Sequence, residues 1–228
     1  MEKDKIKIIL GTAHLGTTPG KCSPDKKFRE AVYSREIVED IKYSLHGLGY
    51  AVLVDYPDLM PNNWIKSNIA KTEQNRELAW RVNYVNDIAK KYGKNNCLYV
   101  SIHVNGAGNG SSWMNARGWS AYTSPGNTKS DLLAEDLYWA AKNRLQEYSK
   151  TFDPAGKQKP IRTDLSDGDS DIEGRLYVLV NTICPAVLTE NLFQDNKEDV
   201  KFLQSDAGKF AITRIHVEGI LKYIHRES

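Results

Sequence analysis

An apolar stretch that ends in a histidine constrains this chain more than any other feature: residues 98–105 are LYVSIHVN. Their β-branched and aromatic side chains predict a buried strand, and a glycine-rich loop that begins at Gly106 ends it abruptly. His103 therefore stands at the carboxyl end of a central strand, the edge at which open α/β sheets bind ligands. A second histidine, His14, takes the same position after the predicted strand 6–10. Two imidazoles are thus expected at one sheet edge.

Amphipathic helices alternate with strands along the rest of the chain. Apolar residues recur at steps of three and four in the helical segments, whereas the strands are short apolar runs bounded by glycine or proline. The predicted helices are 28–46, 69–92, 128–148 and 206–225, and the further predicted strands are 50–54, 119–123, 176–180 and 186–189. No linker or internal repeat divides the chain. We therefore expect one α/β domain over residues 1–228, with a mainly parallel, twisted mixed sheet of about six strands and helices on both faces.

Composition excludes several classes of partner. The chain of 228 residues has 31 lysines and arginines against 29 aspartates and glutamates, a formal net charge of +2. So small a surplus predicts no nucleic-acid and no membrane partner, and no apolar run approaches the ~20 residues that span a bilayer. The first residues carry no apolar signal segment, so we expect synthesis in the cytoplasm. Cys22, Cys97 and Cys184 lack metal or redox spacing, which favours reduced thiols.

Four side chains are candidates for a metal-dependent site. Catalytic zinc takes imidazole and carboxylate ligands, uses three of them from the protein, and keeps a position for water. His14 and His103 are the two of the five histidines predicted to follow strands. Glu30 opens the next helix at the same sheet edge, although a glutamate in a first helical turn is also typical of dipole stabilisation. Glu190 follows the apolar strand 186–189, where a carboxylate needs a partner or a catalytic task.

The segment 151–174 is polar and longer than an ordinary connection. Loops of this length without apolar periodicity are either functional or disordered. We expect this segment to be one or the other.

Four motifs follow one another in a distinctive order: GTAHLG at 11–16, Glu30 at a helix start, SIHVN at 101–105, and PAVLTENLF at 185–193 with Asn196. In this combination the chain resembles the zinc-dependent N-acetylmuramoyl-L-alanine amidases of the Amidase_3 type, in the branch of phage endolysins and mobile elements. The resemblance extends from Ile6 to Tyr223. The chain departs from the family at Ala13-His14-Leu15, where such enzymes usually have Gly-His-Gly.

The resemblance implies a site and a reaction. His14, Glu30 and His103 would bind Zn²⁺, and Glu190 would be the catalytic carboxylate. Zinc lowers the pKa of its bound water and polarises the scissile carbonyl, while the glutamate passes a proton from the water to the departing amine. The bond cleaved would join N-acetylmuramic acid to L-alanine of the peptidoglycan stem peptide.

Three residues beside the motifs are candidates for substrate binding: Asn105, Trp113 and Asn196. Turn, capping or core-packing roles are the alternatives. Peptidoglycan is the implied partner of a monomeric protein that acts on the cell wall, as a holin-released endolysin or as a secreted enzyme whose signal has been removed. Two other functions stay open, a zinc peptidase that cuts within the stem peptide and a non-catalytic peptidoglycan-binding module.

Overall fold

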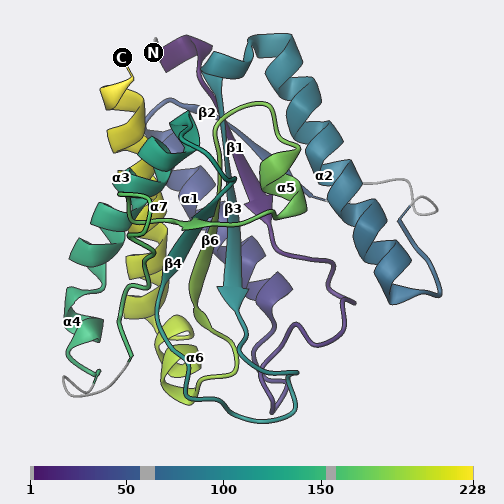
Figure 1. The fold of residues 1–228 in the computed structure, drawn as a ribbon, viewed down its shortest axis with the longest axis vertical. Coiled ribbons are helices and arrows are strands. Elements are labelled where there is room, and N and C mark those ends of the chain that lie inside the picture. The colour runs from purple at the N-terminus through teal and green to yellow at the C-terminus, as the bar shows by residue number, and fades with distance from the viewer. Residues whose placement is uncertain (1–2, 57–64, 153–157, 228) are drawn as a thin grey trace.

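A mixed sheet forms the centre of the molecule in the computed structural model, which describes residues 3–56, 65–152 and 158–227. Its strands are β1 (Lys7–Thr12), β2 (Ala51–Asp55), β3 (Cys97–Asn105), β4 (Ser120–Thr123), β5 (Ile172–Glu173) and β6 (Ala186–Phe193). The described residues give the strand order β2-β1-β3-β6-β4-β5 (Figure 1). The pairs among β1, β2, β3 and β6 are parallel, β4 runs antiparallel to β6, and β5 is parallel to β4. The expected α/β fold is confirmed.

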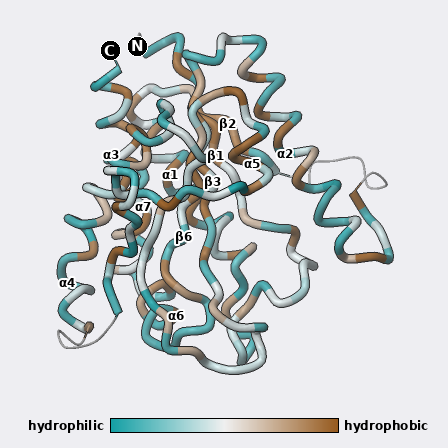
Figure 2. The backbone as a smooth tube through the Cα atoms, in the orientation of Figure 1, coloured by the Kyte–Doolittle hydropathy of each residue, from teal (hydrophilic) through white to brown (hydrophobic). Residues whose placement is uncertain are grey.

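Helices cover both faces of this sheet. They are α1 (Glu30–Gly47), α2 (Ala70–Tyr92), α3 (Lys129–Arg144), α4 (Gln146–Ser149), α5 (Tyr177–Val180), α6 (Lys197–Leu203) and α7 (Asp206–Arg226), with short 3₁₀ turns at η1 (Lys3–Lys5) and η3 (Lys94–Asn96). Alternation along β3 separates the two layers, because successive strand residues point to opposite faces. Val100 and Ile102 pack with α1, α3 and α7, whereas Tyr99 packs with α2 and α5. Figure 2 shows hydrophobic segments concentrated in β1, β2 and α5.

The carboxyl ends of the central strands share one edge of the sheet. In Figure 1 the arrowhead of β3 points to the lower edge, and α5 lies over the sheet above it. Since β1, β3 and β6 are parallel, the loops that follow them leave from this edge. The topology therefore brings the segments with the sequence motifs to one end of the molecule.

The prediction of a strand at 176–180 is wrong. This segment is the short helix α5, in which the Val180 amide donates to the Leu176 carbonyl at 3.0 Å. Val178 and Leu179 are both buried against the α2 side of the core, while Tyr177 and Val180 remain exposed. Consecutive buried positions suit one turn of helix better than an alternating strand, and the edge strand is β5 instead.

The structure also tests several other sequence-based expectations. The short helix α6 was not anticipated, and the strand 186–189 continues as far as Phe193. Cys22, Cys97 and Cys184 are free. Part of the long segment 151–174 lies outside the described residues, but Arg162 pairs through its backbone with Trp119, so this part of the segment runs beside β4. No helix within the described ranges combines the length and hydrophobicity of a membrane span.

Candidate metal centre

The fold brings His14, Glu30 and His103 together. His103 Nδ1 lies 3.0 Å from Glu30 Oε1, and His14 Nε2 lies 3.5 Å from the same oxygen. The two imidazole rings stand edge to face, with centroids 5.0 Å apart and an interplanar angle of 87°. One ligand atom from each side chain lies within 4.8 Å of the other two, a spacing that no other His, Cys, Asp or Glu group of the described chain achieves. This donor set fits a three-ligand zinc site.

Glu30 is the first residue of α1, and its carboxylate turns back across the end of β3. The Val104 amide donates to Oε1 at 3.2 Å, and Lys21 Nζ lies 3.9 Å from Oε2. The side chain is 1% exposed, and Oε2 accepts no hydrogen bond within the described residues. Burial raises the pKa of Glu30, but the hydrogen bond with His103 and the neighbouring positive charges hold it below its usual value. A buried anionic oxygen that accepts no hydrogen bond is costly, and a bound cation would satisfy it.

His14 occupies a constrained loop after β1. Its backbone has φ +46°, in the left-handed region that residues other than glycine rarely adopt. Polar contacts fix this conformation, since the Ala13 amide donates to Ser34 Oγ at 2.8 Å and Arg35 donates to the His14 carbonyl at 3.1 Å. Burial lowers the pKa of His14 to about 3. The ring is therefore neutral at pH 7, the form that binds metal ions.

A buried ionic network behind this loop was missed by the sequence analysis. Arg81 of α2 pairs with Asp55 at the end of β2 and with Glu77 one turn earlier at 2.8 Å. Asp55 also accepts hydrogen bonds from the Thr12 amide at 2.8 Å and from the Tyr99 hydroxyl at 2.7 Å. All five residues are buried. The network therefore ties the end of β1, where the His14 loop begins, to the neighbouring strands and to α2.

Glu190 faces the same centre from the adjacent strand. It is the register partner of His103 between β6 and β3, and partners in a parallel ladder project to the same face. Its Oε2 atom is buried and accepts no hydrogen bond from the described residues. Burial and the charge of Glu30 raise the pKa of Glu190 well above its usual value, while Lys21 lowers it. The arrangement leaves Glu190 outside the group of three possible ligands but beside it.

The three candidates for substrate binding have local contacts. Asn105 accepts a hydrogen bond from the next backbone amide at 2.8 Å. Asn196 caps α6 by accepting from two backbone amides at 3.0 and 3.1 Å, and it donates to the Met114 carbonyl at 3.1 Å. Trp113 packs against the core, with Lys197 Nζ 5.7 Å from its ring centroid. Their roles in substrate binding stay predictions.

A protein-family model matches nearly the whole chain. Residues 8–222 match the family model Amidase_3, whose description is N-acetylmuramoyl-L-alanine amidase. The chain belongs to this family. Membership confirms the resemblance carried by the sequence motifs and the class of enzyme that it indicated.

One curated relative is a longer protein than this chain matches. The chain is 29% identical over 128 residues to the endolysin of Bacillus phage SPP1, a match that covers 56% of this chain and 40% of that protein. It thus spans about two fifths of the length of this curated relative.

Solved structures share the fold over nearly the whole chain. The CwlD amidase from Clostridioides difficile, solved in complex with the GerS lipoprotein, superposes with a TM-score of 0.71 at 22% identity and covers 97% of this chain and 99% of that one. The catalytic domain of the CD27L endolysin, described as targeting Clostridia difficile, gives a TM-score of 0.60 at 20% identity and covers 95% of this chain and 97% of that one. AmiC2 of Nostoc punctiforme gives 0.66 at 19% identity, covering 97% and 98%. These likenesses establish the amidase fold.

Proposed function

We propose that residues 1–228 form a single catalytic domain of a zinc-dependent N-acetylmuramoyl-L-alanine amidase. The substrate is peptidoglycan, and the bond cleaved is the amide between N-acetylmuramic acid and L-alanine of the stem peptide. One observation carries the proposal: His14, Glu30 and His103 converge on a common centre, and Glu190 stands beside it on the next strand. The family description supports the choice of bond.

The chain's own residues suit this hydrolysis. His14, Glu30 and His103 would hold the ion, and zinc bound there would activate a water molecule and polarise the amide carbonyl. Glu190 takes the proton from the water on a carboxylate oxygen and passes it to the departing amine nitrogen. A general base in this role contributes ~10² to 10⁴ in rate.

The cell wall is the proposed place of action, and the monomer is the proposed state. The endolysin relative supports action on the wall. The three possible ligands and Glu190 all come from one chain, so the proposed centre needs no second copy. Release by a holin and secretion are both compatible with this proposal.

Purified sacculi test the proposed function. The protein is first assayed for bound zinc, then incubated with sacculi before and after removal of metal by a chelator and readdition of zinc. We expect soluble stem peptides with a new L-alanine amino terminus and glycan strands with intact lactyl groups, released only in the presence of zinc. New termini inside the stem peptide would identify a peptidase instead, and binding without any fragments would identify a binding module.

A further inference from the structure

Paired strand residues form a row across the sheet, from the proposed metal centre at β3 to a segment beyond β4 that carries Lys159 and Arg162. His103 is the register partner of Glu190, and Glu190 is in turn the partner of Ser120 on β4. Beyond β4, the Arg162 amide donates to the Trp119 carbonyl at 2.8 Å, which sets Arg162 beside Ser120 on the same face. Adjacent strands lie ~4.8 Å apart, so the backbone of Arg162 is about 10 Å from that of Glu190.

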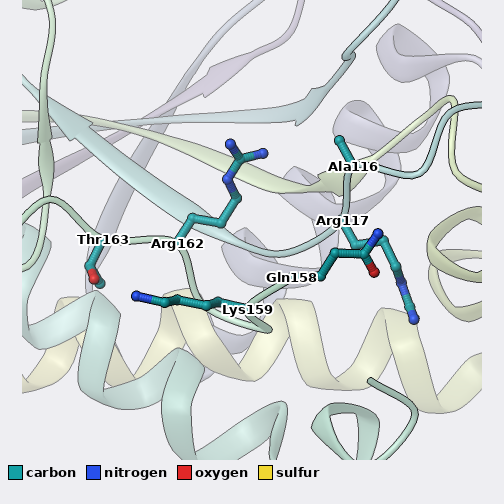
Figure 3. A pocket seen from close by; sticks show the side chains of 6 residues that line it. All are labelled: Ala116, Arg117, Gln158, Lys159, Arg162 and Thr163. Atoms are coloured by element: carbon teal, nitrogen blue, oxygen red, sulfur yellow. The ribbon is translucent and has the colours of Figure 1, made fainter. Parts of the chain in front are cut away.

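A pocket of about 320 Å³ opens at the end of this row (Figure 3). The described residues that line it include three cations and no acid: Ala116, Arg117, Gln158, Lys159, Arg162 and Thr163. Figure 3 shows Arg117 pointing toward the α7 layer and Arg162 pointing to the opposite side. The backbone pairing of Ile161 with Trp119 and of Ser120 with Glu190 places Arg162 on the face that carries Glu190.

The three cations that line the pocket differ in whether an acidic side chain neutralises their charge. Arg117 pairs with the buried Asp199, with Nε 3.0 Å from Oδ1, and is thereby neutralised. Lys159 and Arg162 form no ion pair with any acidic side chain in the described part of the chain. The Arg162 guanidinium carbon instead lies 5.1 Å from the ring centroid of Phe193. A guanidinium that is held over a buried ring, and that pairs with no carboxylate among the described residues, is preorganised to accept one from a ligand.

Gly118 allows this arrangement. It has φ +109°, and a Cβ atom there would lie 2.3 Å from the Lys159 carbonyl oxygen and 3.2 Å from Arg162 Cγ. Only glycine lets the segment with Lys159 and Arg162 approach β4 so closely. The position of Arg162 therefore depends on a glycine at position 118.

We propose that this pocket binds a free carboxylate of the stem peptide through Arg162, with Lys159 as the second cation. The inference rests on the proposed function, because it assumes that a stem peptide binds with its first amide beside Glu190. An extended peptide advances ~3.4 Å per residue, so the carboxylate of its second or third residue reaches a site about 10 Å away. The enzyme then prefers stems whose carboxylate is free over stems in which it is amidated.

Paired substrates test this preference. Two pairs of muropeptides are compared, one pair differing at the second stem residue and the other at the third, each as carboxylate or carboxamide. We expect the wild type to show at least about tenfold higher kcat/KM for the acid in one pair, the effect of one charge-assisted bidentate contact. Arg162→Gln should lower kcat/KM for that acid to the level of the amide, and Arg162→Lys should retain part of the difference.

A matched control is Arg175→Gln, which removes an exposed arginine outside the pocket and should leave the preference unchanged. Circular dichroism of each variant checks that the fold is retained. If neither pair shows a preference, or if Arg162→Gln keeps it, the carboxylate pocket is wrong.

A binding measurement separates this inference from the proposed function. Calorimetry with metal-free protein and the same stem peptides, without the sugar, should show tighter binding of the acid, abolished by Arg162→Gln. Cleavage of sacculi without this difference would overturn the pocket alone. If the protein fails to cleave sacculi but still binds the acid peptide more tightly than the amide, the proposed amidase activity is wrong and the carboxylate site remains. Binding of polyglycerol phosphate through Arg162, without discrimination between acid and amide, would overturn the assignment to the stem peptide.

Discussion

Glu190 of β6 stands directly opposite His103 of β3 in a parallel register, and both side chains project to the face of the sheet that α2 and α5 partly cover. One strand would thus supply a metal ligand and its neighbour the proton-transfer group. Because the two strands are hydrogen-bonded and buried, the separation of these groups is set by the sheet rather than by a loop.

Glu190→Gln tests the proton-transfer role. The amide keeps the size of the side chain but cannot accept the proton, so kcat should fall by ~10² to 10⁴. Zinc content and thermal stability should not fall, because the substitution removes a buried carboxylate beside Glu30. The exposed Glu198→Gln serves as the control. A rate within tenfold of the wild type would exclude Glu190 as the base.

Glu30→Gln tests the ligand set. The glutamine oxygen can still accept from the Val104 amide, so the end of β3 should remain in place. The loss of the anionic ligand should weaken zinc binding at least about tenfold, measured by competition with a chromogenic chelator. Glu36→Gln, on the exposed side of the same helix, should bind zinc as the wild type does. Equal affinity of the Glu30 variant would remove this residue from the site.

Arg81→Met tests the buried network. The substitution leaves Asp55 and Glu77 buried without their cation, so the free energy of unfolding should fall by about 3 to 5 kcal/mol. Urea denaturation measures the change. Arg76→Met on the same helix removes only an exposed hydrogen bond to a backbone carbonyl and should cost less than about 1 kcal/mol. Similar costs for the two variants would contradict the assigned role of the network.

His216 predicts a dependence of stability on pH. Its Nδ1 lies 2.8 Å from the Ile212 carbonyl and its Nε2 lies 2.8 Å from Thr189 Oγ1, and burial lowers its pKa to about 4. In the unfolded chain the His216 imidazole has its ordinary pKa, near 6.5. Between pH 4 and pH 6.5 the unfolded chain therefore binds more protons at this residue than the folded chain does. This group therefore lowers stability as pH falls from about 6.5 to 4, by on the order of 3 kcal/mol in all.

Urea denaturation at pH 7 and pH 4 measures this contribution. His216→Gln should lose less stability over that range than the wild type, because glutamine does not titrate. His46→Gln, at an exposed position of α1, should follow the wild type. Parallel curves for the wild type and the His216 variant would refute the assignment.

Local sequence patterns predicted some of this site and could not predict the rest. The positions of His14 and His103 at one edge follow from strand periodicity, since parallel strands share a direction. The signal for Glu30 was weaker, because acidic residues are common in first helical turns. Its place at the start of the helix after the His14 loop made it a candidate, and the resemblance to a family strengthened that prediction.

Other parts of the structure depend on contacts between distant segments. Arg81 meets Asp55 across 26 positions, and Arg162 reaches Phe193 only after its segment has joined β4. The wrong strand at 176–180 has a different origin, since an apolar run this short carries no periodicity that separates a strand from a helical turn.

Glu30 and His103 are separated by 73 positions and come from different layers, a helix on one side of the sheet and a strand within it. Their oxygen and nitrogen atoms meet only after α1 has docked, so an unfolded chain offers an ion no such set of donors. A cation bound there would shift the folding equilibrium toward the native state by mass action. Chelation should therefore lower the unfolding temperature of the whole domain, in addition to stopping hydrolysis.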